Sequence, residues 1–255
     1  MHLTDPIRIL PGCRLWLAEF DTPDSGPAGF SEEELLVARL STRDLRRWQQ
    51  YRPERKKRQF LNSRLAVRAV LRQEFEKGSE QIQIDSDEQG RPVLHSGQLS
   101  HLPQISISHS ADIVAIAVSD GGNSMGVDLE IAQPLRVESL QQIAMHPHEK
   151  LWCDAQGGLQ SEALLALWTI KESVWKTLHS DSHLGMSDII LELDHRSPGV
   201  HICGWRGAGD QFRSRCFVSQ CASFFSETIC LESVIREPWS QPFRGCVTQR
   251  TMMQK

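Results

Sequence analysis

Two short segments place acidic and basic side chains at spacings that could act on phosphate. The first, 126–130, reads GVDLE, and the alternation of a strand would put Asp128 and Glu130 on one face and Leu129 on the other. The second, 168–176, reads WTIKESVWK, and helical spacing would put Glu172 and Lys176 one turn apart on one face. Three carboxylates around one point, with an ammonium beside them, suit a divalent cation that acts on phosphate oxygens.

These residues also have ordinary explanations. An Asp-x-Glu pair at the end of a strand is often a pair of solvated edge residues. On the helix expected from Ser161 to about His179, Glu172 lies at the border of the apolar face, where an ion pair with Lys176 would satisfy it without a metal. Lys171 falls within the apolar face, where it could cover tryptophan with its aliphatic stem or reach a phosphate in a cleft.

A basic block in an acidic protein indicates an anionic partner. The chain has 255 residues and a formal net charge of −4, yet residues 43–72 hold eleven Lys or Arg and only two acids. Arg64, Arg68 and Arg72 recur every fourth residue, which would stack like charges on one helix face and destabilise an isolated helix. A polyphosphate ligand would offset this repulsion, because guanidinium groups bind phosphate bidentately. A solvated basic face is the alternative.

A polar segment is expected at a turn between two apolar strands, 104–108 and 113–119. Residues 108–112 read SHSAD, and such residues often cap turns. At the strand ends Ser108, His109 and Ser110 would point the same way. This arrangement would offer hydrogen-bond donors to an anion.

Composition places the chain among ordinary globular proteins, with 40% hydrophobic and 24% charged residues. No apolar run approaches the roughly 20 residues of a membrane helix, and the N-terminus lacks an export-signal pattern. Seven cysteines without regular pairing favour reduced thiols in a cytosolic protein. His146, His148, Glu149 and Cys153 have the chemistry of a zinc site, although their spacing matches no common structural pattern.

We expect an α+β fold of two halves that meet near residues 121–124. In the first half the patterns predict strands at 7–20, 82–85, 93–94, 104–108 and 113–119, and helices at 31–40 and 53–77. In the second half they predict strands at 126–131, 189–193, 200–205, 212–220 and 226–233, and helices at 137–144, 148–153 and 161–179. The predicted domains are therefore 1–122 and 123–245, followed by a frayed tail, 246–255.

Five collinear motifs resemble the Sfp-type 4′-phosphopantetheinyl transferase family. They are 58–68 (RQFLNSRLAVR), 90–94 (GRPVL), 105–110 (ISISHS), 126–130 (GVDLE) and 168–176 (WTIKESVWK). The likeness runs from about Arg43 to Leu193. It implies two similar α+β halves in a pseudo-two-fold arrangement, with the active site at their junction.

The resemblance also implies a reaction. It is the transfer of the 4′-phosphopantetheine arm of coenzyme A to a serine of an apo acyl or peptidyl carrier protein. The transfer would use Mg²⁺, or Mn²⁺ in its place, and release adenosine 3′,5′-bisphosphate. Acceptors from fatty-acid, polyketide or nonribosomal peptide biosynthesis all fit. The expected protein is a cytoplasmic monomer that binds neither nucleic acid nor a membrane.

By the same resemblance each site residue has an implied role. Asp128, Glu130 and Glu172 resemble the metal ligands. Glu172 also resembles the base that deprotonates the acceptor serine, and Lys176 resembles the catalytic lysine near the leaving pyrophosphate. The residues that resemble contacts to the coenzyme A phosphates are Arg58, Arg64, Arg91, Ser108, His109 and Lys171.

Two other functions could use the same side chains. A metal-dependent phosphohydrolase would direct the acids at water. A nucleic-acid-binding module would use the basic helix, but only Trp48, Tyr51 and Phe60 are available beside it as an aromatic platform.

Overall fold

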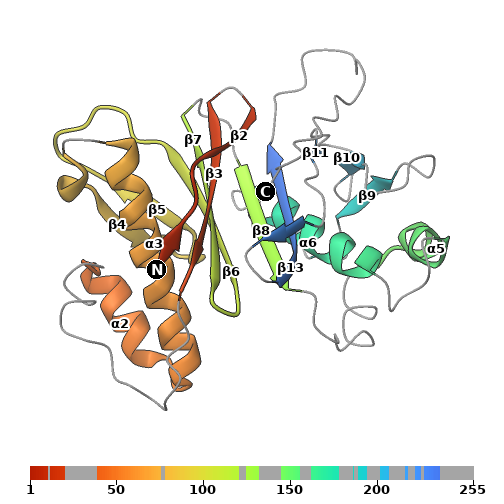
Figure 1. Ribbon diagram of the computed structural model, residues 1–255, viewed down its shortest axis with the longest axis horizontal. Coiled ribbons are helices and arrows are strands. Elements are labelled where there is room, and N and C mark those ends of the chain that lie inside the picture. The colour runs from red at the N-terminus through yellow and green to blue at the C-terminus, as the bar shows by residue number, and fades with distance from the viewer. Residues whose placement is uncertain are drawn as a thin grey trace.

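The computed structural model is a mixed helix and sheet protein, as the sequence predicts (Figure 1). It describes residues 1–10, 12–20, 39–75, 78–120, 125–131, 145–155, 162–177, 186, 189–193, 202–206, 216–217, 222–224 and 227–235. The predicted half boundary, the tail, the helix at 137–144 and nearly all of the helix at 31–40 lie outside these residues. None of the helices described is long and apolar enough to cross a membrane.

The N-terminal part is built on a five-stranded antiparallel sheet. Its strands are β1 (His2–Leu3), β2 (Ile7–Leu10), β3 (Cys13–Glu19), β6 (Gln104–Ser110) and β7 (Ile113–Ser119), in the order β1-β3-β7-β6 with β2 also paired to β3. On one side of this sheet lie α2 (Thr42–Gln50), α3 (Glu54–Glu74), a 3-10 turn (Ser79–Gln81) and the hairpin of β4 (Gln83–Ser86) and β5 (Pro92–His95) (Figure 1).

The second part lies on the other side of the sheet. Its strand β8 (Met125–Ile131) pairs antiparallel with β13 (Glu227–Ile235), which also pairs with β11 (Cys216–Phe217) and β12 (Ala222–Phe224). The helix α6 (Glu162–Thr177) packs against β8 and β13. Farther from the sheet are α5 (Pro147–Ala155) and the hairpin of β9 (Ile190–Leu193) and β10 (Ile202–Arg206) (Figure 1).

Alternation along β3 gives the sheet a core on each face. Leu15 and Leu17 pack in one cluster with Val127 and Leu129 of β8, whereas Trp16 packs in another cluster with residues of α3 and β4. Each fully buried leucine or valine contributes roughly 1.5–3 kcal/mol. The first cluster therefore holds β8 firmly against the sheet, and alternation leaves the opposite face of β8 for polar side chains.

Most of the predicted elements in the described ranges are confirmed within a few residues, and two differences affect the site. The first is α2, which the sequence analysis did not predict. Its N-cap is Ser41, whose Oγ accepts a hydrogen bond from the Asp44 amide at 3.0 Å. The second is β6, which continues to Ser110, so His109 lies in the strand rather than in the turn.

Candidate active site

A glycine brings strand β8 and helix α6 into close contact. A Cβ atom on Gly126 would lie only 2.0 Å from the carbonyl oxygen of Ser173 and 3.1 Å from Cβ of Lys176. Only glycine permits this approach without a shift of the backbone. The residues that follow Gly126 on β8 are therefore held beside the last turns of α6.

Asp128 and Lys176 form an ion pair across this contact. Lys176 Nζ donates to Asp128 Oδ1 at 2.7 Å and to the carbonyl oxygen of Val127 at 3.0 Å. Ser108 Oγ donates to the same Asp128 oxygen at 2.7 Å. The other carboxylate oxygen, Oδ2, is buried and has no hydrogen-bond partner among the residues that the structure describes. A buried oxygen of this kind needs a cation or a donor to offset its desolvation.

Serines at alternate positions of β6 connect this strand to β8. Ser106 Oγ accepts a hydrogen bond from one β8 amide at 3.0 Å, and Ser108 Oγ accepts from a second at 3.2 Å. Ser110 Oγ donates to Glu130 Oε2 at 3.0 Å. The sequence contained a signal for this arrangement, because residues i, i+2 and i+4 of a strand share one face. The sequence analysis had grouped Ser108 and Ser110 with His109 instead.

The acids of β8 and α6 share one electrostatic environment. Burial raises the pKa of Glu172 to about 7; Asp128 and Glu130 raise it too, and Lys176 opposes them. Burial also raises the pKa of Glu130, and the charge of Asp128 adds to this effect. Because the charge of Asp128 adds to the effect of burial on both glutamates, an additional positive charge would favour the ionised forms of Glu130 and Glu172.

This donor set fits a divalent cation. Mg²⁺ prefers carboxylate oxygens, and the site offers three carboxylates. One of them, Asp128, has a buried oxygen without a partner in the described part of the chain. Across the described ranges, however, no three or more His, Cys, Asp or Glu side chains lie close enough to hold a metal ion as they stand. Glu130 and Glu172 would have to move toward Asp128 to share one ion.

His109 lies on the other face of β6 from Ser108 and Ser110, because successive side chains of a strand alternate. The expectation that the three side chains point the same way is therefore wrong. Its ring is exposed to solvent. Desolvation by the surrounding protein nevertheless lowers the pKa of His109, the charges of Lys176 and Arg55 lower it as well, and Asp128 raises it. His109 is thus close enough to sense the charges of the site.

Two cations expected to contact coenzyme A lie in buried ion pairs instead. Lys171 Nζ is 2.7 Å from Glu149 Oε2, and both side chains are completely buried. Arg64 Nε donates to Asp44 Oδ2 at 2.6 Å, and its Nη2 donates to Ser86 Oγ at 2.8 Å. Burial of an isolated charge is energetically unfavourable, and these carboxylates offset the desolvation cost by acting as counter-ions. Both cations are therefore buried, and neither lies where a ligand could reach it from solvent.

The other expected phosphate contacts are more accessible, apart from Ser108, which is buried against Asp128. Arg58 and Arg91 are half-buried. The guanidinium of Arg91 donates to Gln104 Oε1 at 3.4 Å. These two arginines and His109 are the expected phosphate contacts with solvent-accessible surface.

The stack of arginines on α3 has a structural explanation. Arg68 is buried and donates to the backbone carbonyl of Ile82, whereas Arg72 is exposed. Burial lowers the pKa of Arg68 to about 10, and neighbouring arginines lower it as well. A phosphate ligand is therefore not needed to explain why Arg64 and Arg68 lie on one face of α3, since both are buried and bonded within the fold.

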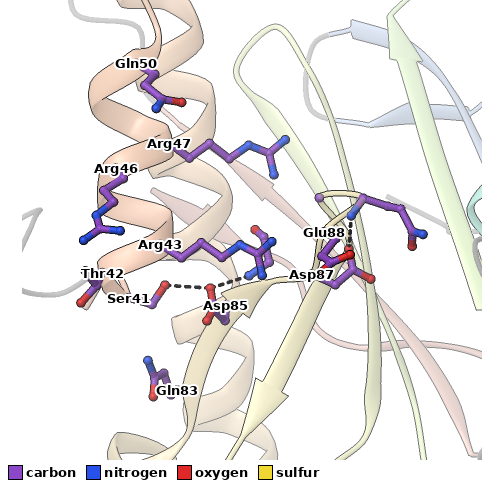
Figure 2. A pocket seen from close by; sticks show the side chains of 13 residues that line it. Ser41, Thr42, Arg43, Arg46, Arg47, Gln50, Gln83, Asp85, Asp87 and Glu88 are labelled. Carbon is purple, nitrogen blue, oxygen red and sulfur yellow. Dashed lines mark hydrogen bonds between the residues drawn. The ribbon is translucent and has the colours of Figure 1, made fainter.

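A pocket of about 680 Å³ lies between α2 and the turn of the β4–β5 hairpin. Figure 2 shows Arg43 and Arg47 extending from α2 toward the turn that carries Asp87 and Glu88, whereas Arg46 extends away from it. Arg47 also covers Gly90, where a Cβ atom would lie 2.8 Å from its Nη1. The pocket shares no lining residue with the carboxylate site. Its lining is Ser41, Thr42, Arg43, Arg46, Arg47, Gln50, Gln83, Asp85, Ser86, Asp87, Glu88, Gln89 and Gly90.

The residues with zinc-binding chemistry connect α5 to β9 instead. Nδ1 of His146 lies 2.6 Å from Nδ1 of His148, and His148 Nε2 lies 2.7 Å from the carbonyl oxygen of Leu191. Glu149 accepts from the amides of His146 and Leu191, each at 2.8 Å. Burial raises the pKa of Cys153 to about 12, which disfavours the thiolate that zinc requires.

Comparisons with known proteins identify the family of this chain. A family described as "4'-phosphopantetheinyl transferase, N-terminal" matches residues 30–121, and one described as "4'-phosphopantetheinyl transferase superfamily" matches residues 124–224. A protein of Synechocystis sp. (strain ATCC 27184 / PCC 6803 / Kazusa), named "Putative 4'-phosphopantetheinyl transferase", is 27% identical over 184 residues, which is 71% of each chain. The chain belongs to the 4′-phosphopantetheinyl transferase superfamily and is an enzyme of that class.

Proposed function

We propose that this enzyme transfers the 4′-phosphopantetheine arm of coenzyme A to a serine of an apo acyl or peptidyl carrier protein, with Mg²⁺, and releases adenosine 3′,5′-bisphosphate. The observation that carries the proposal is the ion pair of Lys176 with Asp128, at 2.7 Å, beside Glu130 and Glu172, whose pKa values are raised chiefly by burial and then by the charge of Asp128. Positive charge and carboxylates at one point are what an alkoxide attack on a phosphate diester requires.

In this mechanism Glu172 acts as the base. It would take the hydroxyl proton of the acceptor serine, since a positioned carboxylate can act as a general base. The serine oxygen would then form a bond to the phosphorus that carries the pantetheine arm. The bond from that phosphorus to the bridging oxygen of the pyrophosphate would break, and its electron pair would leave with adenosine 3′,5′-bisphosphate.

Lys176 would balance the charge that develops on the leaving group. Its ammonium is already directed by Asp128 and the Val127 carbonyl, so little reorganisation is needed. Asp128, Glu130 and Glu172 would hold the metal, which would supply Lewis-acid stabilisation of the phosphate oxygens when bound.

We further propose that the pocket beside α2 holds the nucleotide end of coenzyme A. Arg43 and Arg47 extend toward it, and Gly90 of the GRPVL motif lies in its wall. Arg91, the next residue, is half-buried. Guanidinium groups suit the phosphates of this end of the molecule. With Arg58 and His109, these side chains replace Arg64 and Lys171 as candidate phosphate contacts.

The arrangement of two halves also stays a proposal. We propose domains of 1–122 and 123–245 with the site at their junction, and support comes from the hydroxyls of β6 that bind backbone amides of β8. A monomer in the cytoplasm, without nucleic acid or membrane binding, is still our prediction.

Intact-mass analysis tests the proposed function. Purified enzyme would be incubated with coenzyme A, Mg²⁺ and several apo carrier proteins, each with its acceptor serine or with that serine changed to alanine. We expect the serine form to gain one phosphopantetheinyl group and the alanine form to gain nothing. If coenzyme A is instead hydrolysed and no carrier gains mass, the phosphohydrolase alternative is correct.

A further inference from the structure

A closed triangle of buried polar side chains joins α2, α3 and β4. Arg64 of α3 donates from Nε to Asp44 Oδ2 at 2.6 Å and from Nη2 to Ser86 Oγ at 2.8 Å. Ser86 Oγ completes the triangle by donating to Asp44 Oδ1 at 2.8 Å. The three residues are 5%, 0% and 2% exposed. Both carboxylate oxygens of Asp44 are therefore bonded inside the fold.

This triangle adjoins the pocket described above, because one of its members, Ser86, is a lining residue. Asp44 is on α2 between Arg43 and Arg47, which belong to one wall. Ser86 ends β4, and the turn that follows it forms the other wall. A second hydrogen bond links the same two walls, in which Ser41 Oγ donates to Asp85 Oδ1 at 2.8 Å.

An arginine suits this place for geometric reasons. Its planar fork directs two donors at once, so Arg64 fixes the separation and orientation of Asp44 and Ser86 together. The guanidinium also lies over the ring of Phe60, with 4.6 Å between its Cζ atom and the ring centroid. A ligand in the pocket would meet Arg43 and Arg47, whereas Arg64 would act only through the position of the walls.

We propose that Arg64 is a positioning residue for coenzyme A: together with Asp44 and Ser86 it sets the distance between α2 and the β4–β5 turn, and it makes no contact with the ligand. This inference rests on the proposed function and on the pocket as the site of the nucleotide end. It corrects the role that the resemblance implied for Arg64.

The test uses the full-length enzyme and coenzyme A titrated in a calorimeter at several salt concentrations. Arg64→Gln alone would leave a buried carboxylate without its counter-ion, so the main variant is Arg64→Gln with Asp44→Asn, which removes both charges together and keeps the shape of the side chain at position 44. Arg47→Gln represents a direct contact. Arg72→Gln, an exposed position on the same helix, is the control.

If Arg64 positions the walls, the double variant weakens coenzyme A binding by roughly tenfold or more, since misplaced contacts are costly. Its salt dependence stays that of the wild type, because no exposed charge pair with the ligand is lost. Its kcat at saturating coenzyme A is also retained. We expect Arg47→Gln to weaken binding and reduce the salt dependence, and Arg72→Gln to match the wild type.

Two results would overturn the inference alone. In the first, the double variant binds coenzyme A as the wild type does, which would make the triangle irrelevant to the pocket. In the second, its salt dependence falls as in Arg47→Gln, which would make Arg64 a direct contact. A wild-type enzyme that binds no coenzyme A would instead overturn the proposed function together with the inference.

Discussion

Replacing Glu172 by glutamine should make the metal-free protein more stable at neutral pH while it abolishes transfer. The pKa of this carboxyl rises from 4.5 to about 7, chiefly through burial and then through Asp128. Below pH 4.5 the group is protonated in the folded and the unfolded chain alike. Between pH 4.5 and 7 the unfolded chain loses its proton first, so the free energy of unfolding falls as pH rises. Glutamine removes this dependence.

The size of the effect follows from the same values. At 1.36 kcal/mol per pH unit, the difference between 4.5 and about 7 gives roughly 3 kcal/mol as an upper bound. Glu172 retains some exposure to solvent, so we expect about 1–2 kcal/mol. Nearly all of it should be present by pH 8 and little of it at pH 5.

Urea unfolding at pH 5, 6, 7 and 8, with a chelator present, measures this difference. Glu80→Gln is the matched control, because Glu80 is exposed. The reasoning would be refuted if Glu172→Gln were no more stable than the wild type at pH 8, or if its advantage did not grow with pH. Added Mg²⁺ should then stabilise the wild type and have less effect on the variant, since a proposed ligand is lost.

Three further perturbations test separate parts of the structure. Gly126→Ala places a Cβ atom 2.0 Å from a carbonyl oxygen of α6 and should destabilise the fold by about 3 kcal/mol, whereas Gly97→Ala, which meets nothing within 4 Å, should change the thermal melting temperature little. Lys171→Met leaves the buried charge of Glu149 without its partner and should lower the free energy of unfolding in urea by about 3–5 kcal/mol. Calorimetry should find the affinity for coenzyme A unchanged. A selective loss of that affinity would restore Lys171 as a phosphate contact. The lowered pKa of His109 leaves the imidazole neutral at pH 7 in the absence of ligand, and a bound phosphate nearby should favour its protonation. The affinity for coenzyme A should therefore rise from pH 8 to pH 6 in the wild type but not in His109→Ala.

The sequence predicted the strand at 126–131 and the helix at 161–179 well, because strand and helix periodicity are local properties. Alternation in 126–130 places Val127 and Leu129 in the core and Asp128 toward α6, as the structure has it. The helix spacing in 168–176 brings Lys176 to Asp128. No local pattern, however, indicates how closely β8 and α6 approach, which depends on what a side chain at Gly126 would meet.

The sequence predicted the surroundings of the cations less well, because the sequence around a charged residue does not show whether its side chain faces solvent or a buried counter-ion. Arg64 and Lys171 lie in motifs of the resemblance, and the fold pairs them with Asp44 and Glu149, which are 20 and 22 residues away in the chain. Such pairing depends on tertiary packing. The helix that contains Asp44 was not predicted at all, although Ser41 three residues earlier is a helix N-cap signal.

The two carboxylate oxygens of Asp128 differ in their partners, and a sequence motif cannot show this difference. Oδ1 accepts hydrogen bonds from Lys176 and Ser108, and Oδ2 is buried with no partner within the described ranges. A cation on Oδ2 would therefore leave the bonds of Oδ1 intact. Lys176 would then keep its place while the metal binds, so that the ammonium for the leaving group and the ligand for the metal are both oriented by one carboxylate. Because Ser108 also donates a hydrogen bond to that carboxylate, we infer that its hydroxyl would contribute by orientation rather than by contact with phosphate.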